Sequence, residues 1–277
     1  EINLLNGLFN LETQVLAPHA PSQLVTMVAP VCWVPDAQCP FWEGFIEAAS
    51  CRDRDMAAYL QRLCGYILTN SAEEEVLPIL YGGGANGKSL FLGGIRDLLG
   101  SGEYALTLSQ DTILNSRAYG LPYFYRQLER KRVAFAIELN RDSTLNEAMT
   151  KTLSGNDECS ARGIGKDPVQ FKSRAKIIMA VNHLPVLTST DHATRRRIHV
   201  VPFRKQFDGS VKKDELERQI QAERDGIFAW MVSGCQEWRK QGLNPPAAVR
   251  KATDAYFATN DHTGAYLKER TKSVAGG

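Results

Sequence analysis

The stretch Gly82-Gly83-Gly84-Ala85-Asn86-Gly87-Lys88-Ser89 decides how the rest of the chain is interpreted. It fits the pattern G-x-x-x-x-G-K-[ST], the phosphate-binding loop of nucleoside triphosphatases. An apolar, strand-like run over residues 76–81 precedes it, and a helical pattern over residues 88–99 follows it. Strand, glycine-rich turn and helix in this order form the context in which such a loop works. The sequence therefore predicts that this segment binds a nucleoside triphosphate.

Each residue type in the loop has a physical role. Glycines let successive backbone N–H groups turn inward around an anion, and the helix that follows directs its partly positive end at the same phosphates. Lys88 places an ammonium on the β- and γ-phosphate oxygens, and Ser89 offers its hydroxyl to Mg²⁺. We expect ATP and Mg²⁺ here, held by residues that are consecutive in the chain: Gly82, Gly83, Gly84, Ala85, Asn86, Gly87, Lys88, Ser89 and Leu90.

The composition is that of a globular protein with nearly balanced charge. The chain has 277 residues, of which 43% are hydrophobic and 23% charged, enough for one large or two modest domains. A net charge of +2 does not mark a general polyanion binder, so any nucleic-acid contact must come from a local patch. No apolar run approaches the ~20 residues of a membrane span, and we expect no membrane partner. The six cysteines are scattered without a C-x-x-C pair, which favours free thiols over zinc.

Three regions separate along the chain. Residues 1–75 start with short β-like runs, become mainly helical from about residue 41, and are expected to serve packing or oligomerisation. Residues 76–205 alternate strands with helices, and residues 206–277 are helical. The middle region has apolar runs typical of parallel strands that are covered by helices on both faces: 76–81, 133–137, 177–181 and 198–201.

Two helices are predicted in more detail. The capping box Thr144-Leu145-Asn146-Glu147 predicts a helix over residues 145–154. Apolar residues from Leu216 to Met231 recur at helical spacing and predict one long helix, ended by Gly242.

Polar residues stand where two of the predicted strands end. Glu138 follows the run 133–137, and Asn182 follows the run 177–181. Ligands of parallel sheets sit at the carboxyl ends of strands, so both side chains should face the γ-phosphate. A carboxylate there can activate the attacking water, and an amide can position it. The alternatives are a surface residue at a strand end for Glu138, and a turn before Pro185 for Asn182.

Basic residues suggest further contacts. Arg195-Arg196-Arg197 is either a solvated or polyanion-binding patch or the source of an arginine finger. An arginine that reaches a neighbour's γ-phosphate accelerates phosphoryl transfer by about 10³ to 10⁵-fold, and this role requires an oligomer. Residues 159–172 are predicted to form a β-hairpin with a basic tip at Lys166. In the channel of a ring, Lys166 would contact nucleic-acid phosphate, whereas a lysine on a tip is otherwise a solvated charge.

The order of these motifs resembles the superfamily 3 helicases, which are AAA+-type ATPases. The likeness is greatest to the helicase part of phage, plasmid and poxvirus-type primase–helicases. It rests on the phosphate loop, Glu138, Ala161-Arg162, Asn182-His183-Leu184-Pro185 and Arg196-Arg197, and it covers nearly the whole chain. It implies an α/β fold of the P-loop AAA+ type, with a central, mostly parallel sheet, a helical N-terminal domain and a helical C-terminal region.

The resemblance also implies roles for individual residues. Ser89 and Glu138 would hold the metal, and Arg162 and Lys166 of the hairpin would contact single-stranded DNA. The catalytic residues would be Lys88, Glu138, Asn182, Arg196 and Arg197.

The implied function is a ring-forming, ATP-hydrolysing DNA helicase that translocates on single-stranded DNA. The implied assembly is a homo-oligomer, usually a hexamer, with a primase–polymerase domain upstream in the full-length protein. The implied setting is the cytoplasm of a bacterial host, with the gene carried by a phage or mobile element.

Two positions depart from the family pattern. Ile137 stands where many related ATPases carry a second acidic residue, and Arg195 stands where relatives are often aromatic. Glu138 would then work alone, and which arginine is the finger stays open. Two other functions also stay open: a nucleotide-dependent DNA-binding initiator or loader without processive unwinding, and a small-molecule P-loop kinase. A kinase would have no use for a basic hairpin.

Overall fold

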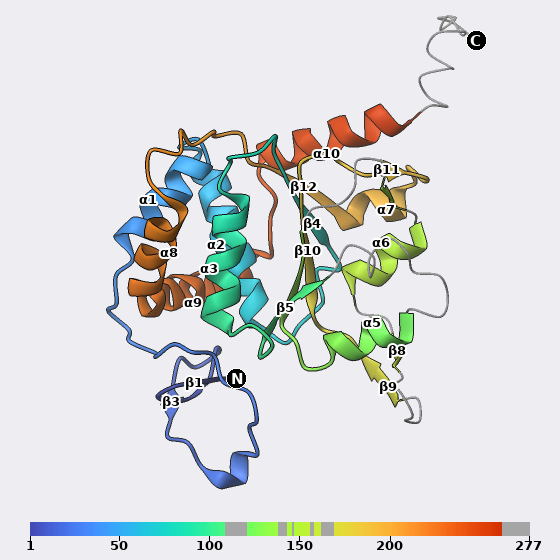
Figure 1. Ribbon diagram of the computed structural model, residues 1–277. Coiled ribbons are helices and arrows are strands. Elements are labelled where there is room, and N and C mark those ends of the chain that lie inside the picture. The colour runs from blue at the N-terminus through green and yellow to red at the C-terminus, as the bar shows by residue number, and fades with distance from the viewer. Residues whose placement is uncertain (109–120, 138–142, 146, 156–157, 162–168, 262–277) are drawn as a thin grey trace, which may run out of the picture.

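The computed structural model describes residues 1–108, 121–137, 143–145, 147–155, 158–161 and 169–261. Its centre is a wholly parallel sheet in the order β12-β4-β10-β6-β5 (Figure 1). The strands are β4 (Leu77–Tyr81), β5 (Ala105–Leu108), β6 (Val133–Ile137), β10 (Lys176–Val181) and β12 (Ile198–Pro202). The predicted α/β architecture with a central parallel sheet is confirmed, and β5 is a strand that the sequence pattern did not predict.

Helices cover both faces of the sheet (Figure 1). One face carries α1 (Pro40–Ala49), α2 (Arg54–Leu68), α3 (Lys88–Leu99), α8 (Lys213–Ala222) and α9 (Arg224–Gln241). The other face carries α5 (Leu121–Leu128), α6 (Glu147–Ser154), α7 (His192–Arg197) and α10 (Ala247–Asn260). In β10, Ile178 belongs to the first hydrophobic core, whereas Ile177 and Met179 belong to the second. Because both faces of the strand are buried, its sequence is apolar without alternation.

Three small sheets surround this core. The N-terminal sheet joins β1 (Ile2–Leu4), β2 (Gly7–Phe9) and β3 (Leu16–Ala17), and is followed by the 3-10 helix η1 (Pro21–Gln23). The strands β7 (Thr144–Leu145) and β11 (Val186–Leu187) pair parallel. The strands β8 (Glu158–Ala161) and β9 (Val169–Lys172) pair antiparallel as the two arms of the predicted hairpin. Its tip, residues 162–168, lies outside the described residues.

Helices α2 and α9 pack backbone against backbone. A Cβ atom on Gly65 would lie 2.0 Å from the main-chain nitrogen of Cys235. A Cβ atom on Gly234 would lie 2.1 Å from the carbonyl oxygen of Gln61. Both distances are far shorter than a van der Waals contact, so only glycine fits at these two positions. The contact holds α2 and α9 together as one unit beside the sheet.

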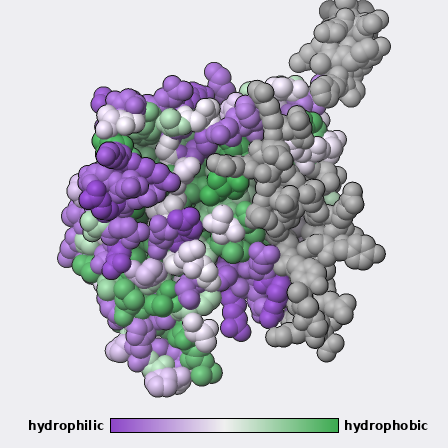
Figure 2. Space-filling model, in the orientation of Figure 1, coloured by the Kyte–Doolittle hydropathy of each residue, from purple (hydrophilic) through white to green (hydrophobic). Residues whose placement is uncertain are grey.

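The predicted long helix over Leu216–Met231 is wrong, because α8 ends at Ala222 and α9 begins at Arg224. Figure 1 shows that the two helices run in different directions, and Figure 2 shows hydrophilic residues gathered on the surface over α8. The carboxylate of Glu223 accepts hydrogen bonds from the main-chain N–H groups of Phe41, at 3.0 Å, and Trp42, at 2.9 Å. These are orphan donors at the start of α1. The break between α8 and α9 thus provides the N-terminal cap of α1.

The helix predicted over residues 145–154 starts at Glu147. Thr144 and Leu145, expected as part of a capping box and its helix, form strand β7. The pairing is held by N–H groups of the β11 segment, with Val186 donating to Ser143 at 2.8 Å. Leu145 is buried in the second core, so tertiary pairing overrides the local capping signal.

Within the described residues, no helix is long and apolar enough to cross a bilayer. No group of His, Cys, Asp or Glu side chains there has a geometry that could hold a metal ion. Among the described residues, five cysteines are free thiols: Cys39, Cys64 and Cys235 are buried, Cys32 is partly buried and Cys51 is exposed.

The cap of α1 predicts a measurable loss of stability. Glu223→Ala removes the acceptor of two main-chain N–H groups and should lower the free energy of unfolding by about 1 to 2 kcal/mol. Urea denaturation followed by circular dichroism measures this. Glu217→Ala, which removes an exposed glutamate from the same helix segment, is the matched control and should change the stability by less than about 0.5 kcal/mol. Equal losses in the two variants would contradict the capping role.

Candidate nucleotide-binding site

The loop Gly82–Ser89 joins β4 to α3 at the carboxyl edge of the sheet. The predicted strand before it and helix after it are both present. Gly84, Ala85 and Gly87 have φ values of 104°, 50° and 82°. Left-handed residues in such a turn direct successive N–H groups to one side, which produces an anion-binding concavity. Gly87 is also the N-cap of α3, whose first N–H groups have no partner within the helix.

The segment that follows β12 holds this loop in place. A Cβ atom on Gly82 would lie 2.4 Å from the carbonyl oxygen of Phe203, so only glycine fits there. Asn86 is 4% exposed, and its side-chain amide donates to the carbonyl of Lys205 at 3.0 Å. The N–H of Phe207 donates to the carbonyl of Ala85 at 2.9 Å. The loop conformation is thus set by contacts made more than 100 residues further along the chain.

Lys88 and Asn182 meet at the end of the sheet. The ammonium of Lys88 donates to the carbonyl of Gly82 at 2.7 Å and to Oδ1 of Asn182 at 3.1 Å. Burial lowers the pKa of Lys88. No carboxylate forms an ion pair with this ammonium in the part of the chain that the structure describes. The predicted neighbourhood of Lys88 and Asn182 is therefore observed, although their roles stay predictions.

A cavity of about 770 Å³ opens beside Lys88. It is lined by residues 84–90, Ile137 and Asn182, and Ser89 is exposed. Phe45 and Phe207 also line it, with their ring centroids 5.9 Å apart and both rings beside Gly87 of the loop. The size lies within the roughly 300 to 1,000 Å³ of small-molecule sites. The cavity thus combines cationic and N–H donors that suit phosphates with aromatic surface that suits a base.

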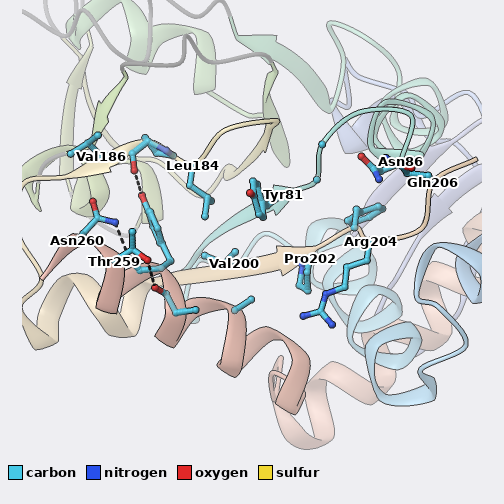
Figure 3. Close-up of a pocket in the computed structure, with 17 residues that line it drawn as sticks. Tyr81, Asn86, Leu184, Val186, Val200, Pro202, Arg204, Gln206, Thr259 and Asn260 are labelled. Carbon is cyan, nitrogen blue, oxygen red and sulfur yellow. Dashed lines mark hydrogen bonds between the residues drawn. The ribbon is translucent and has the colours of Figure 1, made fainter.

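A second cavity of about 660 Å³ lies on the other side of Gly82, between the ends of β4 and β12 and helix α10 (Figure 3). Its walls are mostly apolar, with Leu184 and Val200 among them. Arg204 is the only cationic residue among those that line it, and in Figure 3 its guanidinium points away from Tyr81. A triphosphate needs positive charge close by, so the cavity beside Lys88 is the candidate nucleotide site.

Glu138, Arg162 and Lys166, predicted for catalysis and DNA contact, lie outside the described residues. Ile137, which precedes Glu138 and ends β6, lines the cavity beside Lys88. The two aromatic residues of that cavity were not predicted, because Phe45 and Phe207 are distant in sequence and belong to no motif.

The arginines Arg195–Arg197 lie at the opposite edge of the sheet from Lys88. Helix α7, which carries them, leads directly into the amino end of β12, whereas the loop follows the carboxyl end of β4. The two strands are parallel and in register, with Ile198 opposite Leu77 and Pro202 opposite Tyr81. Five residues of strand span roughly 16 Å. The structure therefore does not bring these arginines to the nucleotide site of their own chain.

Arg197 is engaged within its own chain. It is 8% exposed, and its guanidinium forms an ion pair with Glu75 at 2.9 Å and donates to the hydroxyl of Ser154 at 2.8 Å. These contacts join α7 to the end of α6 and to the segment before β4. Such a buried guanidinium is not available to another subunit.

The other two arginines are closer to solvent. Arg195 pairs with Asp254 at 2.5 Å and lies over the ring of Phe257, 5.4 Å from its centroid. Arg196 is exposed and forms no ion pair or hydrogen bond with any residue that the structure describes. Of the three, Arg196 is therefore the one best placed to act on a neighbouring subunit.

Two family models and several viral proteins match parts of the chain. Residues 80–197 match a family of unknown function (DUF5906), and residues 2–51 match a family described as "D5 N terminal like". The chain is 24% identical over 279 residues to a protein of Acanthamoeba polyphaga mimivirus named "Putative helicase", covering 92% of the chain and 29% of that protein. It is 31% identical over 169 residues to a protein of Invertebrate iridescent virus 6 with the same designation, covering 59% and 17%. A protein of African swine fever virus named "Putative primase" is 22% identical over 200 residues, covering 70% and 21%.

The fold itself has a counterpart among solved structures. The C-terminal region of NrS-1 superposes with a TM-score of 0.66 at 15% identity, over 85% of the chain and 54% of that structure. The chain is thus similar to the superfamily 3 helicase part of primase–helicases, and the resemblance seen in the motifs is confirmed. The chain spans less than a third of the length of the viral relatives it matches.

The two neighbouring arginines should differ in their effect on stability. Arg197→Ala removes the ion pair with Glu75 and the hydrogen bond to Ser154 and should lower the free energy of unfolding by about 1 to 3 kcal/mol. Arg196→Ala, the matched control one residue away, removes an exposed side chain and should cost less than about 0.5 kcal/mol. Urea denaturation of both variants measures the difference. If Arg196→Ala proved the more destabilising, the assignment of Arg197 as the structural member would be wrong.

Proposed function

We propose that this chain is an ATP-hydrolysing DNA helicase module that works as a ring on single-stranded DNA. The observation that carries the proposal is the meeting of Lys88 with Asn182 at the end of a left-handed, glycine-rich loop. The relatives named as helicases and primases support the same assignment. The nucleotide, the metal, the DNA track and the ring are parts of the proposal.

The loop fits a triphosphate. The loop conformation requires glycine at position 82, because a Cβ atom there would clash with the carbonyl oxygen of Phe203. Lys88 provides the ammonium for the β- and γ-phosphates, with backbone N–H groups of the loop and of α3 beside it. Ser89 is exposed in the same cavity, where its hydroxyl would hold Mg²⁺, which adds positive charge at the phosphate oxygens. The base would lie against the aromatic rings of Phe45 and Phe207, which line the cavity.

Hydrolysis transfers the γ-phosphoryl group to water. The water oxygen forms a bond to the γ-phosphorus as the bond to the β–γ bridging oxygen breaks, which yields ADP and inorganic phosphate. Glu138 would take the proton of the attacking water, and the amide of Asn182 would hold that water in line. Asn182 lies where β10 ends, next to Lys88, which suits this role.

Completion of the site requires a second subunit. Arg196 is exposed at the edge of the sheet opposite to its own Lys88, so its guanidinium would stabilise the γ-phosphate of a neighbour. Such a finger operates only in an oligomer, and a closed ring places every subunit between two others. The arms β8 and β9 would carry the DNA-contacting tip, with Arg162 and Lys166.

Loss of the loop ammonium should abolish function. Lys88→Ala should remove nucleotide binding and ATP hydrolysis, because Lys88 is the only cationic side chain of the loop. Lys205→Ala is the matched control: its side chain is exposed, and only its main-chain oxygen contacts the loop. The measurement is ATPase activity with and without single-stranded DNA, combined with size determination in solution. The proposal would be overturned if the wild-type protein stayed monomeric with nucleotide and DNA and if single-stranded DNA did not stimulate its ATPase activity.

A mixing experiment tests the finger in trans. Arg196→Ala should reduce ATP turnover by at least about 10³-fold while nucleotide binding is retained. Mixing Arg196→Ala subunits with inactive Lys88→Ala subunits should restore part of the activity, because the second variant supplies an intact arginine to the loop of the first. Absence of any recovery in assemblies shown to contain both variants would place the action of Arg196 within one subunit.

A further inference from the structure

Two short segments at the amino edge of the sheet are unusually basic. Residues 129–132 read Glu-Arg-Lys-Arg, and residues 172–176 read Lys-Ser-Arg-Ala-Lys. Together they hold six basic residues and one acidic residue, in a chain whose net charge is only +2. The segments lie side by side, because they lead into the neighbouring parallel strands β6 and β10. The N–H of Lys176 donates to the carbonyl of Arg132 at 3.0 Å.

Two of these cations are buried and have structural roles. Lys176 donates to the carbonyl of Thr69 at the end of α2, and its ammonium lies 4.7 Å from the centroid of the Tyr66 ring. Arg132 donates to the carbonyl of Glu1 at 2.5 Å. Burial is the main cause that lowers the pKa of Lys176, and repulsion from the guanidinium of Arg132 is the second. The two basic side chains therefore lie close together below the surface. Both side chains donate to main-chain carbonyl oxygens, which fixes their positions below the surface.

The remaining cations reach the surface. Arg130, Lys172 and Arg174 are exposed, and Lys131 is half-buried against the carbonyl of Glu103. We call these four residues the amino-edge patch. Among the residues that the structure describes, no ion pair joins any of them to a carboxylate. The patch is therefore a set of positive charges that the ion pairs of the described residues leave unneutralised.

Glutamates also lie near the patch. Glu158 of β8 stands directly opposite Lys172 in the β8–β9 pairing. Glu129 forms an ion pair with Arg126, and Glu103 interacts at longer range with Lys131. Glu73 lines a hollow of about 300 Å³ together with Lys172, Arg174 and residues 70–72, and its carboxylate accepts from the hydroxyl of Ser71 at 3.0 Å. The residues that line this hollow include two cations and one carboxylate, so their summed charge is positive.

The position of the patch points to its ligand. Lys172 is the last residue of β9, and Arg174 lies between β9 and β10, so the patch is at the foot of the hairpin arms. It is on the edge of the sheet opposite to the nucleotide loop, and it has no part in phosphate binding by Lys88. Exposed cations at two neighbouring strand ends suit a polyanion that runs across them better than a compact ion.

We propose that the amino-edge patch binds the phosphate backbone of single-stranded nucleic acid, with Lys172 and Arg174 as its central contacts. The partner's identity rests on the proposed function, whereas the site is separate from the hairpin tip assigned there. Each phosphate contact on a single strand contributes about 0.7 to the slope of log affinity against log salt. Lys172 and Arg174 together should therefore contribute roughly 1.4.

The test is the binding of fluorescein-labelled oligothymidylate to the full chain, followed by fluorescence anisotropy across a salt series. Lys172→Ala with Arg174→Ala should weaken binding on the order of 20-fold near 0.1 M salt and flatten the slope by roughly 1.4. The matched control is Arg250→Ala with Lys251→Ala, an exposed basic pair on α10, which should bind like the wild type. Arg174 also donates to the carbonyl of Asn70 at 3.3 Å, so its loss can affect folding. The single variant Lys172→Ala should by itself flatten the slope by about 0.7.

Each outcome has a definite meaning. A flatter slope in both Lys172 variants, with thermal unfolding temperatures like that of the control pair, supports the site. If the wild type binds DNA and both Lys172 variants keep its affinity and slope, the site is wrong while the proposed function stands. If the wild type does not bind DNA at all, the DNA part of the proposed function falls, and this site falls with it.

Discussion

The parallel pairing of β4 with β10 is the constraint on which the rest of the site depends. It places the end of one strand, where the glycine-rich loop begins, beside the end of the other, where Asn182 stands. β10 is covered on both faces, so a slip of one residue would turn core side chains such as Met179 from one hydrophobic core to the other. The packing of both cores therefore fixes where Asn182 lies. The distance between Lys88 and Asn182 is a consequence of core register as much as of local loop geometry.

The sheet separates two kinds of chemistry along the strand direction. Its carboxyl edge holds the ammonium of Lys88, the loop N–H groups and the cavity that Phe45 and Phe207 line. Its amino edge holds Arg196, the buried ion pair of Arg197, and the cations at the foot of the β8–β9 arms. Strands of five or six residues connect the two edges rigidly. A displacement at one edge is thus transmitted to the other as movement of a packed unit rather than along a flexible loop.

Much of this arrangement was predictable from local sequence, and the remainder depended on distant partners. Apolar runs and the loop pattern are local, so four strands and the neighbourhood of Lys88 with Asn182 were predicted. The break at Glu223 depends on α1, more than 180 residues earlier, and the start of α6 depends on β11. Arg195, Arg196 and Arg197 are the same residue type in one short helix. Only Glu75 and Ser154, both distant in sequence, make Arg197 the buried one.

The contacts of Lys88 have a thermodynamic consequence. Its ammonium already donates to the carbonyl of Gly82 and to the amide oxygen of Asn182. In the proposed nucleotide complex, an arriving phosphate oxygen would compete for the same hydrogens, so part of its binding would be an exchange of acceptors rather than a net gain of hydrogen bonds. The exchange would also release the amide oxygen of Asn182, which could then bind a water molecule. Phosphate binding at the loop and water binding at Asn182 would thus be linked without any movement of the backbone.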